Sequence, residues 1–483
     1  MTAAPTSPPA TREPSQRVAA PGWRWWRTHQ PNPAVLLVAI LSFLCKYILI
    51  VALDGALKCV SDECQYLIHG LSLAESLRFE ASGHLWPPLF PLLIAACHKL
   101  FPDSVDAIRV AQALLSSAAI FPLYGIALRA YGRRPALVAV CLFAFFPEWL
   151  GYGIFLRPVV LYVLFFLLAV YFLVRRETPD RSGLILAGVC LGLCSLSKAV
   201  GLYFLPGAII WVVIAARRAG DRSVRKSMVA ASILAAATFL TISPWSVRNF
   251  LQYDRVVLLD LETGTNLSRG QNIGLPPTWD MNVGSRRGRL FQAEGEVRPS
   301  CIQRSRAARN ACEIRNGIRF ALTHPVLSTW RTVLKTTDLL TPANYILSYA
   351  QKEQYMPLLS KTTHQALTLA TTSTWFFALW LGSWSFVLLR PEIGRFLFGY
   401  TIICNLVSVW VTFGTSRFRM TWLPILLIIA APMLSRDPLA AWKKASPAAR
   451  GLALLLLALI VAIFQQRWYT VSHVFDGDWQ PSG

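Results

Sequence analysis

Two adjacent acidic residues, Asp62 and Glu63, follow a long apolar segment within the stretch KCVSDECQY at residues 58–66. A carboxylate at the boundary between lipid and water can take the proton of an attacking hydroxyl group, which is general base catalysis. A structural explanation is also open, because Ser61 followed by two acids is a typical helix start, where the helix dipole favours negative charge. Apolar residues then recur at near-helical spacing and predict a helix lying along the membrane surface.

The composition places these acids in a membrane protein. Of the 483 residues, 54% are hydrophobic and 15% are charged, whereas a soluble domain has about 25% charged residues. We predict an all-α polytopic bundle of about 11 transmembrane helices, with interfacial helices and a large external loop. The apolar segments lie at 34–53, 107–128, 134–151, 155–174, 183–197, 200–216, 228–245, 367–389, 394–413, 418–435 and 450–466.

Lys and Arg residues in short loops predict the orientation of this bundle, since such loops favour the cytoplasmic side. If residues 86–101 do not cross the membrane, all the basic loops fall on one side and the N-terminus is cytoplasmic. Residues 86–101 are then a proline-started helix in the outer interface, and the alternative is a twelfth span. The basic stretches are the N-terminal arm, RAYGRRP (129–135), RRETPDR (175–181), RRAGDRSVRK (217–226), RPEIGR (390–395) and RDPLAAWKK (436–444).

The net charge of +22 is explained by these loops and by contact with anionic membrane lipids. Nothing in the chain resembles a nucleic-acid-binding module, so no nucleic acid is predicted as a partner.

Four of the ten cysteines fall in pairs in the two external segments, Cys59 with Cys64 and Cys301 with Cys312. An oxidising exterior allows each pair to form a disulfide. Four free thiols are the alternative, because the distance between the Cβ atoms cannot be read from a sequence.

Five motifs occur in order between residues 34 and 435. They are the Asp62-Glu63 pair, PPLFPLL (87–93), IRVAQALLS (108–116), PWSVRNF (244–250) with TGTNLSRGQN (263–272), and SRFRMTWLPILLI (416–428). In this order they resemble the GT-C glycosyltransferases, in the branch that contains the protein O-mannosyltransferases and the lipid A aminoarabinose transferases.

The resemblance implies a hexosyl- or pentosyltransferase that moves a sugar from a polyprenyl-phosphate-linked donor to an acceptor hydroxyl, with inversion, on the external face of the membrane. The first acid of the pair is catalytic in that family, which carries over to Asp62 as general base. Glu63 is expected to orient Asp62 or the acceptor. One base suffices, because a phosphate leaves without protonation whereas a glycosidase needs an acid. A glycan, a lipid or a protein remains open as acceptor, and a bacterial inner membrane with a periplasmic site fits best.

The predicted order along the chain is then a disordered cytoplasmic arm at 1–33, a GT-C-like catalytic membrane module at 34–245 with its external loop at 54–106, a large external loop at 246–366, C-terminal transmembrane helices at 367–466, and an external tail at 467–483.

Three arginines are candidates for binding the donor phosphate. Arg248 stands just outside the seventh span, and Arg417 and Arg419 open the tenth span from the same side. A guanidinium group can hold a phosphate through two parallel hydrogen bonds. The alternative for all three is an interfacial arginine that reaches lipid headgroups.

Three further residues are candidates for substrate binding. Lys198 lies near the outer end of the fifth span, where a charge favours a functional role. His84, before the Pro-Pro pair, is a candidate for meeting the sugar or phosphate, or it is structural. Many relatives carry a second acid at the turn where this chain has Arg157 and Pro158, so either Glu148 takes that role or the enzyme works without it.

No metal or other cofactor is predicted. The oligosaccharyltransferase branch of this fold uses an Asp-x-Asp motif with a divalent cation, and the chain has neither that motif nor a His/Cys ligand cluster. The arginines at 286–309 form a surface facing solvent or headgroups, or else a groove for an anionic acceptor.

Two other classes of protein are alternatives to an enzyme. A transporter or lipid flippase would show internal repeats and polar residues at mid-membrane, but the polar residues here cluster near the outer interface. A non-catalytic scaffold would leave the ordered motifs unexplained.

Overall fold

The computed structural model describes residues 32–53, 59, 62–79, 86–102, 104–271, 301, 305–344, 346–347, 360–389, 395–412 and 414–472. His84 and most of the predicted arm and tail lie outside these ranges, as do Arg286, Arg287, Arg289 and Arg304. Within the ranges the chain is helical, which confirms the predicted all-α class.

The helices follow the chain in three groups. The first contains α2 (Pro33–Ala52), α3 (Asp62–Ser76), α4 (Leu89–Leu100), α5 (Val105–Ala118), α6 (Ile120–Tyr131), α7 (Arg133–Ala144), α8 (Pro147–Ile154), α9 (Val159–Val174), α10 (Arg181–Ser197), the 3-10 helix η1 (Ala199–Phe204), α11 (Leu205–Arg218) and α12 (Val224–Tyr253). The second contains α13 (Thr263–Gly270), α15 (Arg306–Thr323) and α16 (Pro325–Leu339). The third contains α18 (Lys361–Leu388), α19 (Arg395–Val411), the 3-10 helix η2 (Ser416–Thr421), α20 (Leu423–Ser435), α21 (Pro438–Lys444), α22 (Pro447–Arg467) and α23 (Tyr469–Ser472).

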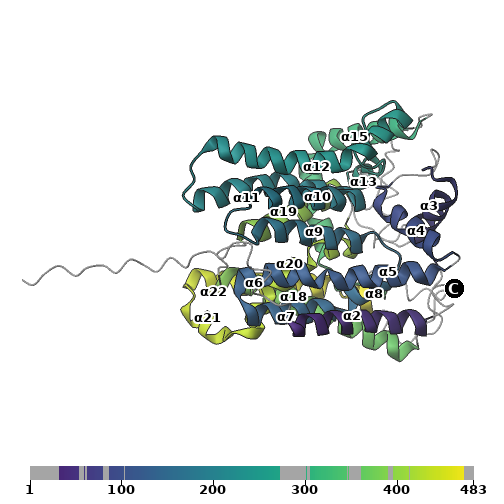
Figure 1. The fold of residues 1–483 in the computed structure, drawn as a ribbon. Helices are drawn as coiled ribbons and strands as arrows, with labels where there is room; N and C mark the ends of the chain where they lie inside the picture. The colour runs from purple at the N-terminus through teal and green to yellow at the C-terminus, as the bar shows by residue number, and fades with distance from the viewer. Residues whose placement is uncertain are drawn as a thin grey trace, which may run out of the picture.

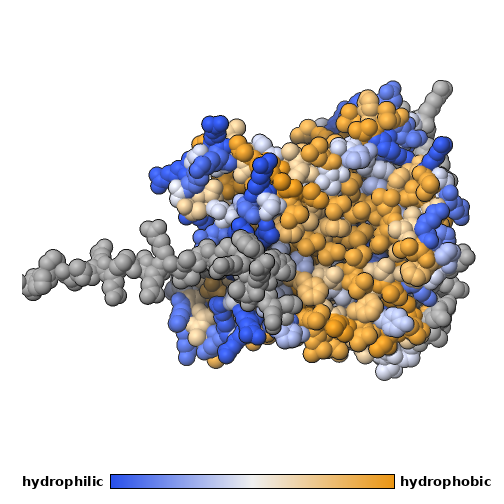
Figure 2. Space-filling view, in the orientation of Figure 1, coloured by the Kyte–Doolittle hydropathy of each residue, from blue (hydrophilic) through white to orange (hydrophobic). Residues whose placement is uncertain are grey.

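The long helices lie side by side along one direction (Figure 1). Helices α9 and α20 carry apolar side chains on all their faces, and nearly all of these side chains are buried. Both features are expected of helices in the middle of a bundle. The outer side chains form a hydrophobic band between two hydrophilic ends (Figure 2). This arrangement suits a bundle that spans a membrane.

Fewer helices than predicted have the length of a full crossing. In the described part of the chain, five helices are long and apolar enough, or up to seven when each bent pair is taken as one span. The bent pairs are α7 with α8, at 54°, and α20 with α21, at 95°. Shorter apolar helices, α9, α10 and α19 among them, account for much of the difference from eleven.

The two ends of the bundle differ in their content. Helices α3, α4, α13 and α15 gather at one end, whereas α21 and the loop between α11 and α12 lie at the other (Figure 1). That loop and its flanks carry Arg217, Arg218, Arg222, Arg225 and Lys226. Asp62, at the start of α3, therefore lies at the end opposite to these basic residues.

Candidate active site

A cavity of about 220 Å³ lies where α3, α13, α19 and the two 3-10 helices meet. Its wall contains aromatic side chains, including Tyr66, Trp86 and Phe418. It also contains three acids and four cations, which are Asp62, Asp260, Glu262, Arg157, Lys198, Arg269 and Arg417. Such a concentration of charge in one small cavity makes it the candidate active site.

Asp62 accepts hydrogen bonds from two arginines that are remote in sequence. Its Oδ2 atom lies 3.0 Å from Nη1 of Arg157 and 2.9 Å from Nη1 of Arg417. Burial raises the pKa of Asp62, but the guanidinium groups of Arg417 and Arg157 outweigh burial and hold the pKa below its usual value. Asp62 is therefore an ionised carboxylate that is bound by two guanidinium groups.

Glu63 supports this arrangement from a buried position. Its Oε1 atom lies 3.9 Å from Nε of Arg157, and its side chain is almost fully buried. Arg157 thus contacts both acids of the pair, through different nitrogen atoms. Of the two adjacent acids, Glu63 positions Arg157 and Asp62 lines the cavity.

The turn that carries Arg157 is held by Gln112, in the middle of α5. The buried side-chain amide of Gln112 donates to the carbonyl groups of Tyr152 (2.9 Å) and Phe155 (2.5 Å). Its carbonyl oxygen accepts the backbone N–H of Arg157 at 3.2 Å. These three bonds explain why a glutamine stands within the apolar motif IRVAQALLS, since the turn between α8 and α9 leaves its own backbone groups unpaired.

Lys198 is the third cation beside Asp62. It follows the last residue of α10, and its Nζ atom lies 5.3 Å from the ring centre of Phe418. The guanidinium of Arg417 lies 5.4 Å from the centre of the same ring. Arg157, Lys198 and Arg417 therefore place three positive charges around one part of the cavity.

The end of α12 returns the chain toward this cavity. Asp254 ends the helix in the left-handed conformation (φ 50°), which reverses the chain direction. Trp245 then donates to the carbonyl of Leu259 at 2.8 Å, and Asn249 donates to the carbonyl of Val257 at 3.2 Å. The motif PWSVRNF thus holds the segment that leads to Glu262.

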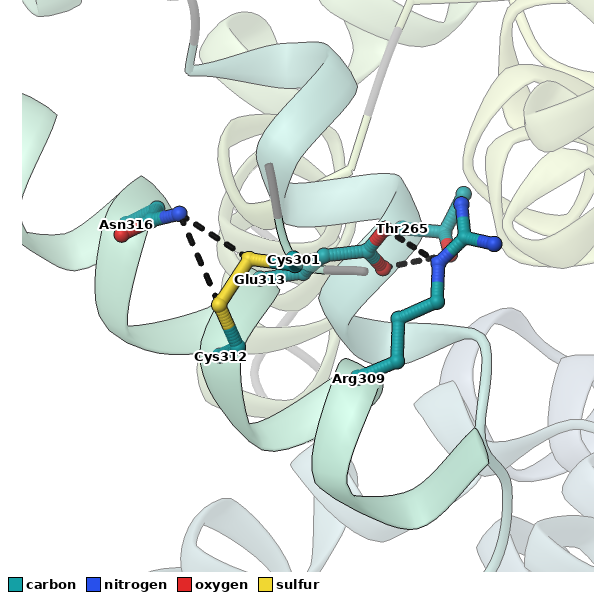
Figure 3. The surroundings of a disulfide bond; sticks show 6 residues. All are labelled: Thr265, Cys301, Arg309, Cys312, Glu313 and Asn316. Carbon is teal, nitrogen blue, oxygen red and sulfur yellow. Dashed lines mark hydrogen bonds and ion pairs between the residues drawn. A yellow bond between two sulfur atoms is a disulfide. The ribbon is translucent and has the colours of Figure 1, made fainter. Parts of the chain in front are cut away.

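Helix α15 fixes the position of α13. Asn310 accepts the N–H of Gly264 at 2.7 Å, and Glu313 binds both Thr265 (2.7 Å) and Arg309 (3.0 Å). Figure 3 shows this glutamate between its two partners, beside the disulfide of Cys301 and Cys312. A side chain at Gly264 would collide with the backbone of Asn310, its Cβ lying 2.3 Å from the carbonyl oxygen.

Helix α16 joins α13 to α19 through buried cations. Arg331 donates to the carbonyl of Gly270 at 3.0 Å, at the end of α13. Lys335 donates to the carbonyl of Trp410 at 2.8 Å, near the end of α19. Helix C-termini expose unpaired carbonyl groups and favour positive charge, so these two residues hold two walls of the cavity together.

Both predicted cysteine pairs form disulfides in the structure. Cys59 and Cys64 enclose Asp62 and Glu63 in a short covalent loop. Cys301 and Cys312 join the segment before α15 to that helix. Among the described residues, no cluster of three His, Cys, Asp or Glu side chains is arranged to hold a metal ion.

The structure separates the predicted substrate-binding residues into two groups. Lys198 and Arg417 line the cavity with Asp62. Arg248, a residue of α12, does not line the cavity; its guanidinium lies 4.8 Å from the ring centre of Trp245 in the same helix and 3.0 Å from the carbonyl of Phe79. It connects the segment after α3 to α12.

Glu148 and Arg419 bind each other outside the cavity. Nε of Arg419 lies 2.7 Å from Oε2 of Glu148, and both side chains are fully buried. Arg419 also donates to the carbonyl of Thr341 at 2.9 Å and stacks over Trp375. We therefore assign this pair a structural role in place of the expected contact with substrate.

Sequence reasoning missed Trp86, Asp260, Glu262 and Arg269 as site residues. In the sequence, Arg157 stands out only as a departure from the pattern of the GT-C family. The signal that could have found Glu262 is its position directly before the motif TGTNLSRGQN. Arg157 could have been found from its location in a turn that the sequence predicts on the same side as Asp62.

Comparison with known proteins gives a consistent result. A sequence model of the family described as dolichyl-phosphate-mannose-protein mannosyltransferase matches residues 86–247, about a third of the chain. No curated protein matches the sequence.

Among solved structures, the archaeal oligosaccharyltransferase AglB from Archaeoglobus fulgidus, in complex with an inhibitory peptide and a dolichol-phosphate, is similar with a TM-score of 0.50 and 16% identity. The similarity covers 93% of this chain and 56% of AglB, so the chain spans about half the length of that protein. ArnT from Cupriavidus metallidurans bound to undecaprenyl phosphate has a TM-score of 0.42 and 14% identity, covering 91% of this chain and 89% of ArnT. The fold assignment rests on the family match and AglB: this chain has the fold of the GT-C membrane glycosyltransferases.

Proposed function

We propose that the protein is a glycosyltransferase that takes a sugar from a polyprenyl-phosphate carrier and passes it, with inversion, to an acceptor hydroxyl. The observation that carries this proposal is the cluster of Arg157, Lys198 and Arg417 around Asp62 in one cavity. The matched family is described by a dolichyl-phosphate-linked mannose donor, and the AglB structure contains a dolichol-phosphate. Both support a lipid-linked phosphate as the group that the cluster binds.

The three cations form a phosphate clamp, defined as Arg157, Lys198 and Arg417. Arginine recognises phosphate through paired hydrogen bonds, and lysine adds a point charge. The acceptor oxygen attacks the anomeric carbon, and the bond from that carbon to the phosphate oxygen breaks. The phosphate leaves with the bonding electrons, and the clamp stabilises the negative charge that develops on it.

Asp62 takes the proton of the acceptor hydroxyl in this reaction. With the clamp closed on Asp62, its lowered pKa makes it a poor base. When the donor phosphate binds, it draws the guanidinium groups away from the carboxylate, and the pKa of Asp62 rises toward its ordinary value. The base thus becomes effective once the donor is in place, which limits wasteful reaction with water.

Competition between Asp62 and the donor phosphate predicts opposite effects of two substitutions. Asp62→Asn should bind undecaprenyl phosphate about tenfold more tightly than the wild type, because both guanidinium groups are released from a charged competitor. Arg417→Gln should bind it about tenfold more weakly, because one charge-assisted hydrogen bond is lost. The affinities are measured with purified protein in detergent, by quenching of tryptophan fluorescence.

The matched control for the clamp is Arg255→Gln, at an exposed position of the same chain, which should leave the affinity unchanged. Weaker binding by Asp62→Asn would contradict the competition between carboxylate and phosphate. Absence of binding by the wild-type protein would contradict the proposed donor class.

The active site is proposed to face the periplasm of a bacterial cell, with the protein in the inner membrane. The orientation of the basic loops supports this side. In intact cells, a membrane-impermeant maleimide should label Cys301 and Cys312 after reduction but not before it, because both thiols are joined in a disulfide. Labelling that requires permeabilised cells would reverse the proposed orientation. The variant Cys301→Ala/Cys312→Ala provides the background.

A further inference from the structure

The cavity has an acidic side, formed by Asp260 and Glu262, which the phosphate clamp does not use. The Oδ1 atom of Asp260 accepts hydrogen bonds from the backbone N–H (3.2 Å) and the hydroxyl (2.8 Å) of Thr263. Asp260 therefore closes the turn that starts α13. Glu262 also lines the cavity, but its carboxylate accepts a hydrogen bond from the indole of Trp86, which lies on a separate segment of the chain.

Glu262 stands on a rigid support. It is the residue directly before α13, and α13 is tied to α15 through Asn310 and Glu313. On its other side, Trp245 holds the carbonyl of Leu259. Groups that recognise a ligand are most effective when the surrounding structure fixes them in this way.

The sugar ring is the part of a donor that we expect next to Glu262. A sugar donor of the proposed class joins its anomeric carbon directly to the phosphate, so a phosphate in the clamp brings the sugar ring into the same space. At about 220 Å³ the cavity is smaller than the roughly 300–1,000 Å³ of typical drug-sized pockets. This size suits a sugar phosphate.

We propose that Glu262 is a specificity-determining residue, which binds hydroxyl or ammonium groups of the transferred sugar and disfavours sugars that carry a carboxylate. This inference rests on the proposed function, since it takes the clamp as the phosphate site. The carboxylate of Glu262 can accept several hydrogen bonds, of which Trp86 supplies one. Hydroxyl groups of the sugar supply others.

The electrostatic environment supports discrimination against acidic sugars. Burial is the main cause that raises the pKa of Glu262 to about 7; the hydrogen bond from Trp86 opposes this change, and the nearby charge of Asp260 adds to it. The charge of Asp62 also raises the pKa, and that of Arg417 lowers it. A carboxylate on the sugar would be repelled by Glu262, Asp260 and Asp62, and repulsion between like charges is strong where little water screens it.

The test uses two carriers that differ in one group, undecaprenyl-phosphate glucose and undecaprenyl-phosphate glucuronic acid, with sugarless undecaprenyl phosphate as the reference. Affinities are measured with the full-length protein in detergent at about pH 8, where a group with a pKa of about 7 is mostly ionised. The wild type should bind the glucosyl carrier at least about tenfold more tightly than the glucuronosyl carrier. Glu262→Gln should reduce this ratio to about threefold or less, because it removes the charge and keeps the size.

Three comparisons separate the possible outcomes. Glu262→Asp keeps the charge and should retain most of the discrimination, whereas Asp254→Asn, at an exposed acid on the same connection, should leave it unchanged. A wild-type preference for the glucuronosyl carrier, or an undiminished ratio in Glu262→Gln, would overturn the inference while the clamp stands. Failure of the wild type to bind sugarless undecaprenyl phosphate would overturn the proposed function itself. Thermal unfolding and gel filtration verify that each variant is folded.

Discussion

Replacing Asp62 with asparagine should slow sugar transfer by about 10²–10⁴-fold, the range that general base catalysis contributes. The amide keeps the size of the side chain and can still accept a hydrogen bond, but it cannot take the acceptor's proton. The reaction is measured in a deletion strain that carries either the wild-type or the variant gene, by mass analysis of the glycans and polyprenyl-phosphate sugars of the cell envelope. The donor should accumulate in the Asp62→Asn strain.

The variant Glu75→Gln is a matched control, because Glu75 lies on the same helix but is exposed. It should transfer at the wild-type rate. Combined with the tighter binding of undecaprenyl phosphate expected for Asp62→Asn, the loss of transfer would separate a defect in chemistry from a defect in donor binding. Wild-type levels of product in the Asp62→Asn strain would eliminate Asp62 as the base.

Replacing Arg419 with methionine should destabilise the protein by about 3–5 kcal/mol, the cost of leaving a buried carboxylate without its partner. Glu148 has both side-chain oxygens buried, and Arg419 is the partner that binds it. The change would also remove the hydrogen bond to the carbonyl of Thr341. Unfolding by titration with sodium dodecyl sulfate, followed by tryptophan fluorescence, measures the loss.

The double variant Glu148→Gln/Arg419→Met distinguishes a buried ion pair from a general packing defect. It removes both charges, so it should recover a large part of the lost stability. Arg255→Met, at an exposed position, should be neutral. If the double variant were less stable than Arg419→Met alone, the pair would not be the source of the stability. The folded fraction of each variant should bind undecaprenyl phosphate with nearly the wild-type affinity, because neither Glu148 nor Arg419 lines the cavity.

Local patterns predicted where the helices form, whereas the length of each helix depends on packing. Each predicted apolar segment contains a helix, because apolar composition and the absence of long polar interruptions favour one. The length of a crossing depends on where each helix breaks, and breaks such as the 54° bend between α7 and α8 depend on packing. Short helices such as α9 are buried by their neighbours, so their own length does not have to match a bilayer.

In the candidate site too, local motifs identify residues, but packing decides what surrounds each of them. Asp62 and Arg417 were proposed from local motifs, and both line the cavity. Arg419 lies two residues after Arg417 and faces a different environment, bound to Glu148. The motif SRFRM could not separate the two, because a 3-10 helix of a few residues turns successive side chains in different directions.

The sequence by itself determined the membrane class of the protein, its helical fold and the candidate acid Asp62, because each depends on composition or on residues adjacent in the chain. Only the tertiary structure decided the partners of that acid. Arg157 lies 95 residues from Asp62, and Arg417 lies 355 residues from it. Only packing of α3 against the rest of the bundle brings both guanidinium groups to one carboxylate oxygen and places Glu262 in the same cavity, because no local spacing relates residues so far apart.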